Sequence, residues 1–115
     1  CFVRGDTRLP MMYMDDAIRA TIALMDAPAE AIGTARGGYN ISGCSFTATE
    51  LAGAVGARVS DFTCDFLPDV RQKYADSWPD SVDDEAAQAD WGWAAEYDLD
   101  AMCDAMIAGL QSSSI

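Results

Sequence analysis

The sequence has 115 residues, of which half are hydrophobic, and a formal net charge of −12 from 19 acidic and 7 basic side chains. This balance argues against disorder and predicts one soluble globular domain over residues 1–115, with one modest core. The sequence contains no histidine, which excludes Ser-His-Asp, Cys-His and His-ligated metal chemistry. Lys73 is the only lysine and the pI is near 4.1, so we expect neither nucleic acid nor an anionic membrane surface as a partner.

The four cysteines are scattered without a C-x-x-C pair, which predicts free thiols, a reducing cytoplasmic location and no metal centre. No run of about 18 uncharged apolar residues predicts a membrane span, and the first five residues lack the pattern of a signal peptide. Because the sequence begins at Cys1 and not at Met, we expect it to be part of a longer chain.

The acidity comes mostly from aspartate, with 15 Asp against 4 Glu. Such a surface is typical of a salt-adapted protein, in which salt screens the repulsion between like charges. An ordinary acidic cytosolic protein is the alternative, and composition leaves both open.

The first predicted elements are a strand and a helix. The apolar run over residues 11–14 predicts a buried strand that ends at the pair Asp15-Asp16. Apolar residues then recur at helical spacing as far as Met25, which predicts a helix that ends near Pro28. Acidic pairs can hold a cation or transfer protons, but at the start of a helix we expect them to cap it.

The middle of the chain predicts two strands and one helix. Residues 39–42 fit a brief strand, and apolar side chains alternate with others over residues 62–66, as in a strand with one buried face. Between them, Thr47 and Glu50 have the spacing of a capping box, which predicts that a helix begins there.

The last part of the chain predicts two helices. One begins at Asp83-Asp84 and ends at Trp91, with Gly92 as its carboxy-terminal cap. The other follows Asp98, where apolar residues recur at helical spacing as far as Leu110, and it leads into a frayed tail over residues 112–114. We expect the tryptophans on either side of Gly92 to pack in the core.

Residues 69–93 contain the candidate functional segment. Trp78 lies in a polar stretch and is followed by Pro79, a setting typical of a loop whose aromatic ring covers a ligand. From the spacing alone, the alternative that Trp78 anchors a satellite of the core stays open.

Several blocks of residues also match a known pattern in order, namely Asp6–Met14, Asp16–Thr21, Tyr39–Asn40, Ser45–Thr47, Arg71–Gln72, Ala75–Pro79 and Asp90–Trp93. Together they resemble the carboxy-terminal portion of the L-threonine 3-dehydrogenases, a family of the extended short-chain dehydrogenase/epimerase type. The resemblance covers nearly the whole chain. The departures are local, at Ala48-Thr49, Tyr74 and Gln88.

The resemblance implies an α/β fold: a substrate-covering carboxy-terminal lobe with short strands and about four helices, without the Rossmann core. It also implies that the complete enzyme uses NAD to oxidise L-threonine to 2-amino-3-oxobutanoate. The sequence has neither the Gly-rich nucleotide turn nor the Tyr-x-x-x-Lys pair of that family, so we expect no catalytic residue and no bound cofactor in this chain alone. NAD would be held by an amino-terminal Rossmann portion, which is the implied partner, and a homo-oligomer is left open.

The resemblance makes Trp78 and Ser77, on the Asp-Ser-Trp-Pro loop, the candidate substrate-binding residues. Leu9 joins them, because related nucleotide-sugar epimerases carry there an arginine that binds the substrate diphosphate, although Arg8 is adjacent. A small amino acid has no diphosphate, so its binding does not require this arginine. The alternative from another class is a truncated, noncatalytic acidic domain that acts as a stand-alone interaction module.

Overall fold

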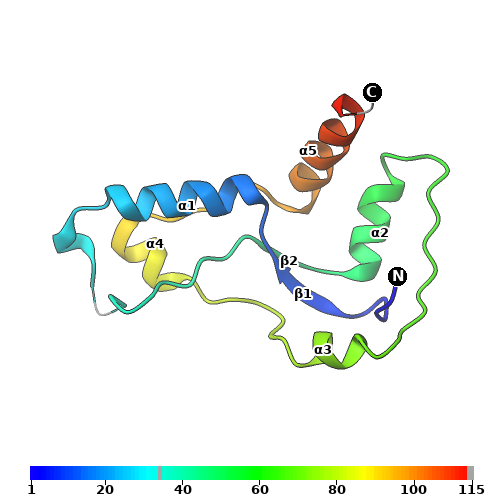
Figure 1. The fold of residues 1–115 in the computed structure, drawn as a ribbon, viewed down its shortest axis with the longest axis horizontal. Coiled ribbons are helices and arrows are strands. Elements are labelled where there is room, and N and C mark those ends of the chain that lie inside the picture. Colours follow the sequence, from blue (N-terminus) through cyan, green and yellow to red (C-terminus); the bar gives the residue numbers. More distant parts are fainter. Residues whose placement is uncertain (34, 114–115) are drawn as a thin grey trace.

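The computed structural model describes residues 1–33 and 35–113, and its elements are spread along an elongated molecule (Figure 1). In chain order they are β1 (Arg8–Met11), α1 (Met14–Asp26), a 3₁₀ turn η1 (Ala29–Ala31), β2 (Cys44–Thr47), α2 (Ala48–Gly56), α3 (Gln72–Asp76), α4 (Glu85–Trp91) and α5 (Leu99–Ser112). This mixed α/β arrangement confirms the expected fold class. The short helix α3 adds to the four helices that the sequence predicts.

The two strands form an antiparallel sheet in the middle of the molecule, with the α1 and α4 helices towards one end and α2 towards the other (Figure 1). Arg8 lies opposite Thr47 and Met11 lies opposite Cys44. The buried strand predicted over residues 11–14 is therefore wrong in position. Met11 ends the strand and Met14 begins α1, and both side chains are exposed, because pairing with β2 sets the limits of β1.

Helix α1 ends before Pro28, as predicted, but its first turn differs from the expectation. Its N-cap residue is Tyr13, which makes no side-chain cap hydrogen bond, so Asp15 and Asp16 do not cap the helix. Asp16 is fully buried instead, and its carboxylate accepts hydrogen bonds from the backbone N–H groups of Glu96 and Tyr97. These partners lie in the segment that leads into α5.

The local signals of the other helices are confirmed. The Thr47 hydroxyl accepts from the Glu50 N–H at 3.1 Å and the Glu50 carboxylate accepts from the Thr47 N–H at 2.7 Å, which completes the capping box of α2. Gly92 follows α4 with a φ of 73°, in the left-handed region. Asp98 caps α5, because its carboxylate accepts from the Ala101 N–H at 2.9 Å.

The predicted strands over residues 39–42 and 62–66 do not form. The backbone of Ser42 bonds to side chains instead: its N–H donates to Asp84, and its carbonyl accepts from the Trp93 indole. The segment before Pro68 runs beside the amino terminus, where the Leu67 N–H donates to the Cys1 carbonyl at 2.8 Å. Neither segment has a regular ladder partner among the described residues, and a strand requires one.

The core beside α1 and α4 is small. Ala20, Ala87 and Trp93 are buried there, with Trp91 and three other half-buried residues packed against them. The Trp91 ring meets Trp93 at a centroid distance of 6.1 Å, so the expected packing role of both tryptophans is confirmed.

The molecule is more open than a compact protein of its length. Its radius of gyration is 16.8 Å, whereas about 13 Å is expected for 115 residues. Its accessible surface is 7709 Å², against roughly 6100 Å² for a folded monomer of this mass. In the part of the chain that the structure describes, no helix is long and apolar enough to cross a membrane.

Candidate functional site

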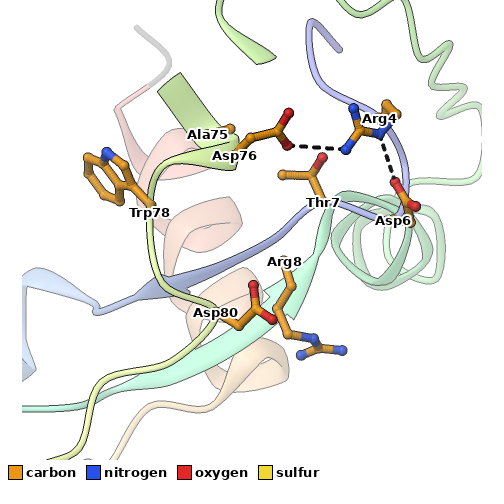
Figure 2. Close-up of a pocket in the computed structure, with 8 residues that line it drawn as sticks. All are labelled: Arg4, Asp6, Thr7, Arg8, Ala75, Asp76, Trp78 and Asp80. Carbon is orange, nitrogen blue, oxygen red and sulfur yellow. Dashed lines mark hydrogen bonds and ion pairs between the residues drawn. The ribbon is translucent and has the colours of Figure 1, made fainter. Parts of the chain in front are cut away.

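A cavity of about 300 Å³ lies between the residues that lead into β1 and the loop that follows α3 (Figure 2). It is lined by Arg4, Asp6, Thr7, Arg8, Ala75, Asp76, Trp78 and Asp80. Most of these side chains are charged or polar, so the cavity suits a polar ligand.

Gln72 brings the two walls of this cavity together. The residue is 7% exposed, and its side-chain carbonyl accepts from the Arg4 backbone N–H at 2.7 Å. Its amide nitrogen donates to the Thr7 hydroxyl at 2.9 Å and to the Asp76 carboxylate at 2.7 Å. The bonds to Arg4 and Thr7 therefore fix α3 against the chain before β1, because breaking them would leave the buried Gln72 amide unsatisfied.

Arg4 carries the positive charge on the wall formed by the residues that precede β1. Its guanidinium donates to Asp76 at 3.1 Å and to Asp6 at 3.4 Å, and Figure 2 shows both bonds as dashed lines. All three side chains are substantially exposed, so these pairs orient the groups more than they stabilise the fold.

Arg8 is held on the other wall by the sheet and by α2. Its guanidinium donates to the Ser45 carbonyl at 2.9 Å and to the Glu50 carboxylate at 3.0 Å. The Thr47 backbone N–H, together with the Arg8 guanidinium, lowers the pKa of Glu50 below its ordinary value. The Ser45 hydroxyl donates to the Asp80 carbonyl, which fixes the loop that carries Trp78 to β2.

The structure brings only one of the three predicted site residues to the cavity. Trp78 lines it and is 59% exposed, which favours a loop residue over a core anchor, and Figure 2 shows its indole ring turned away from Arg4, Asp6 and Thr7. Ser77 ends α3, and its hydroxyl donates to the Tyr74 carbonyl at 2.7 Å without lining the cavity. Leu9 lies opposite Phe46 in the sheet and does not line the cavity, whereas its neighbour Arg8 does. Adjacent side chains of a strand point to opposite faces of the sheet, so only one of these two residues can face the cavity.

No pattern in the sequence marks the cavity residues that precede β1, which are Arg4, Asp6 and Thr7. They lie more than 60 residues from α3, and no spacing rule connects segments so far apart. For Asp6 and Thr7, a signal exists in the pair of short blocks at Asp6–Met14 and Arg71–Gln72, which meet through Thr7 and Gln72. Arg4 lies outside both blocks.

The described residues do not fit the pyrophosphate of a dinucleotide. That group binds where a Gly-rich turn after a strand exposes the N–H groups of a helix amino terminus. The turn from β1 to α1 contains no glycine, and the first turn of α1 carries Asp15 and Asp16. Helices α2 and α5 also begin with carboxylates, at Glu50 and Asp100, which repel a phosphate.

Comparisons with known proteins give consistent relatives. The chain is 46% identical over 108 residues to the mitochondrial L-threonine 3-dehydrogenase of Bos taurus, covering 93% of this chain and 28% of that protein. It is 39% identical over 111 residues to an uncharacterized epimerase/dehydratase of Staphylococcus haemolyticus, covering 96% of this chain and 35% of that one. No protein-family model matches.

Solved structures agree with these relatives. The holo form of the GalE-like L-threonine dehydrogenase from Cupriavidus necator matches with a TM-score of 0.91 and 53% identity, over 96% of this chain and 35% of that one. The L-threonine dehydrogenase from Clostridium difficile matches with a TM-score of 0.93 and 35% identity, over all of this chain and 36% of that one.

The chain thus spans only about a third of the length of the relatives it matches. By sequence and by fold, it is homologous to the carboxy-terminal part of the L-threonine 3-dehydrogenases and of related epimerase/dehydratases.

Proposed function

We propose that this chain is the substrate-covering part of an NAD-dependent L-threonine 3-dehydrogenase, which oxidises L-threonine to 2-amino-3-oxobutanoate. The observation that supports the proposal is the charged cavity beside Trp78, in a chain that matches threonine dehydrogenases at 46% and 53% identity over nearly its whole length. In this proposal the activity belongs to the assembled enzyme, and this chain supplies the part of the active site that covers the substrate.

The mixture of charges around the cavity suits an amino acid. L-threonine carries a carboxylate and an ammonium group, and the cavity offers the Arg4 guanidinium together with the Asp76 and Asp80 carboxylates. Charge-assisted hydrogen bonds to both ends of a zwitterion would orient it more strongly than neutral contacts.

In this proposal Trp78 lies over the substrate and excludes water from it. Ser77 and Leu9 act indirectly. The Ser77 hydroxyl holds the end of α3 through the Tyr74 carbonyl, and Leu9 lies opposite Phe46 in the sheet that carries Arg8. Both residues position the walls of the cavity.

The oxidation itself requires groups from the amino-terminal portion of the enzyme. NAD, when bound there, would accept the hydride from the substrate. The only lysine of this sequence, Lys73, is exposed on α3, and no tyrosine lies four residues before it. This chain would therefore bind, orient and cover the substrate, and the general base would come from elsewhere.

A nucleotide-sugar substrate fits the cavity less well. The cavity is lined by three carboxylates, at Asp6, Asp76 and Asp80, against the two guanidinium groups of Arg4 and Arg8. A diphosphate carries only negative charge and would be repelled by these carboxylates, whereas the ammonium group of an amino acid pairs with them. The amino-acid substrate is therefore favoured over the epimerase chemistry named for some of the relatives.

The experiment is a chimera in which this chain replaces the matching carboxy-terminal part of the Cupriavidus necator enzyme. We expect NADH formation, followed by absorbance, that depends on L-threonine and that does not occur with a nucleotide sugar. The 115-residue chain alone, mixed with NAD and threonine, is the control and should produce no NADH. A folded chimera that forms no NADH with threonine would contradict the proposal.

A further inference from the structure

Helix α3 carries Asp76 to the wall of the cavity, but a helix of 5 residues fixes its side chains only weakly by itself. Among the residues of α3, all of which the structure describes, only Gln72 is buried. We infer that Gln72 is a positioning residue, which orients the Asp76 carboxylate to bind the ammonium group of the substrate. The inference rests on the proposed function and names the residues that would select an amino acid over the same molecule without its amino group.

The hydrogen bonds of Gln72 fix which way its amide faces. Its carbonyl oxygen accepts from the Arg4 N–H at 2.7 Å, so its amide nitrogen faces the other way. The two N–H groups of that nitrogen donate to the Thr7 hydroxyl at 2.9 Å and to the Asp76 carboxylate at 2.7 Å. Turning the amide over would place donor against donor at Arg4, so only this orientation is stable.

Thr7 ties the amide to the rest of the fold. Thr7 is 9% exposed, its N–H donates to the Arg4 carbonyl at 3.1 Å, and its carbonyl accepts from the Ala48 N–H, also at 3.1 Å, in the first turn of α2. A series of hydrogen bonds therefore runs from α2 through Thr7 and Gln72 to Asp76. It holds the Asp76 carboxylate in place although that side chain is 49% exposed.

Both bonds to the Asp76 carboxylate end on the same oxygen. The Gln72 amide and the Arg4 guanidinium donate to Oδ1, at 2.7 and 3.1 Å, and Figure 2 shows the bond from Arg4 as a dashed line. Among the residues that the structure describes, none donates to Oδ2. An oriented carboxylate with a free oxygen can accept a charge-assisted hydrogen bond from an ammonium group without first breaking another bond.

The other two carboxylates of the cavity are held less firmly. Asp6 has an 83% exposed side chain, and the bond that its carboxylate accepts from the Arg4 guanidinium is long, at 3.4 Å. The Asp80 carboxylate bonds to no described residue, because Ser45 binds only the backbone carbonyl of Asp80. Ordering a free side chain during binding costs affinity, so Asp76 is the better partner for an ammonium group.

The guanidinium beside Asp76 suits the other end of the substrate. Arg4 donates to Asp6 through Nε and to Asp76 through Nη2, whereas its Nη1 donates to none of the described residues. An α-amino acid carries its ammonium and carboxylate groups on one carbon atom. A carboxylate and a guanidinium that lie side by side, each with a free atom, match these two groups.

The experiment measures recognition of the ammonium group in the chimera with the Cupriavidus necator amino-terminal portion. L-2-aminobutyrate and butyrate, which differ only in this group, are titrated calorimetrically in the presence of NAD. The Kd of butyrate divided by that of L-2-aminobutyrate gives the preference for the ammonium group. We expect Gln72→Met, which keeps a side chain of similar length without the amide, to lower this preference about tenfold.

The matched control is Gln88→Met. The Gln88 amide also donates to a carboxylate four residues away, that of Asp84 at 2.7 Å, but neither residue lines this cavity. Its replacement should leave the preference for the ammonium group unchanged.

A double-mutant cycle separates positioning from a merely structural effect. Asp76→Asn keeps an oxygen that accepts from Gln72 but removes the charge, so it should lower the preference by itself. In that background, Gln72→Met should change the preference by no more than about twofold, because the group that it orients is already neutral. If Gln72→Met does not fold, Gln72→Asn takes its place, since its shorter amide cannot reach Arg4 and Asp76 together.

Three results would overturn the inference. A preference that stays within about twofold of the natural one in Gln72→Met or in Asp76→Asn would mean that Asp76 does not bind the ammonium group through Gln72. Equal effects of Gln72→Met in the two backgrounds would make its role structural. A chimera that binds neither ligand would have no such site.

Calorimetry needs no turnover, so the inference and the proposed function can fail separately. A preference that depends on Gln72 in a chimera that does not oxidise threonine would support the inference and reject the proposed function. Threonine oxidation with a preference that does not depend on Gln72 would do the reverse.

Discussion

Asp16 illustrates how one buried charge can connect distant parts of the chain. Its carboxylate accepts from the Arg19 guanidinium at 2.7 Å, from the Glu96 N–H at 3.1 Å and from the Tyr97 N–H at 3.0 Å. Burial opposes its ionisation, but these hydrogen bonds outweigh burial and lower the pKa of Asp16 below its ordinary value of 3.8. The residue therefore fixes the segment before α5 onto α1.

Replacing this carboxylate should destabilise the protein. We expect Asp16→Asn to lower the free energy of unfolding by about 2–4 kcal/mol, because two backbone N–H groups and Arg19 lose a charged acceptor. Urea unfolding measures the loss. The control is Asp15→Asn on the same turn, whose side chain is exposed and should matter little.

The effect of Asp16→Asn on the free energy of unfolding should depend on pH. The pKa of Asp16 is lower in the folded state than in the unfolded state, so its contribution to stability is present above pH 3.8 and is lost as the pH falls through the folded value. The difference between the natural chain and Asp16→Asn should shrink on acidification. A difference that stays constant down to acidic pH would mean that the ionised carboxylate is not what stabilises the contact.

Replacing Trp78 tests whether this residue covers the substrate in the cavity. In the active chimera, Trp78→Ala should lower kcat/KM for threonine and leave the melting temperature nearly unchanged, because the ring is 59% exposed. The control is Trp93→Ala, since Trp93 is only 4% exposed and truncating a core tryptophan typically costs about 3–5 kcal/mol. If Trp78→Ala melts early while its folded fraction keeps a normal kcat/KM, the residue is a packing anchor and does not cover the substrate.

At the scale of the elements, two glycines should respond to alanine with opposite signs. Gly92 has a φ of 73° after α4, and nothing lies near an added Cβ, so Gly92→Ala should cost about 1 kcal/mol from backbone strain alone. Gly109 lies within α5, also with open space beside it, so Gly109→Ala should stabilise by about 0.5–1 kcal/mol. Urea midpoints measured side by side give both signs, and a destabilised Gly109→Ala would contradict the expectation.

The elements that could be predicted from the sequence are those whose limits are set locally. The capping box at Thr47 and Glu50 and the glycine at position 92 act within one helical turn and lie where they were expected, and the helix expected after Asp98 begins at Leu99. Local spacing is enough to place them because their hydrogen bonds close over three or four residues.

The predictions that failed depended on partners far away in the sequence. Residues 39–42 and 62–66 have the composition of strands, but a strand requires a neighbour to accept its ladder bonds, and among the described residues Ser42 bonds to the side chains of Asp84 and Trp93. Asp16 looked like a cap because the segment that binds it is 80 residues away. The cavity was predictable only at Trp78, since its walls meet through the buried amide of Gln72.

At the scale of the whole molecule, negative charge dominates the surface. Acidic side chains outnumber basic ones by 19 to 7, and most of the basic ones are already paired, as with Arg58, which binds both Asp100 and Asp104. Such pairs between exposed groups contribute little, about 0–1 kcal/mol each. The remaining carboxylates repel one another, and this repulsion favours the unfolded chain, in which they lie farther apart.

Salt should therefore stabilise this protein. The Debye length falls from about 10 Å at 0.1 M to about 3 Å at 1 M salt, so KCl screens repulsion between carboxylates that are not in contact. Screening also weakens the ion pairs, but only 7 basic side chains can form them against 19 acidic ones. We expect the thermal midpoint to rise by about 5 °C or more between low and molar KCl, a shift that corresponds to about 1 kcal/mol for a domain of this size.

The control is the double variant Asp26→Asn/Asp61→Asn, which removes two exposed charges and should start from a higher midpoint with a smaller response to salt. A flat response in both chains would identify an ordinary acidic protein in which charge repulsion does not limit stability.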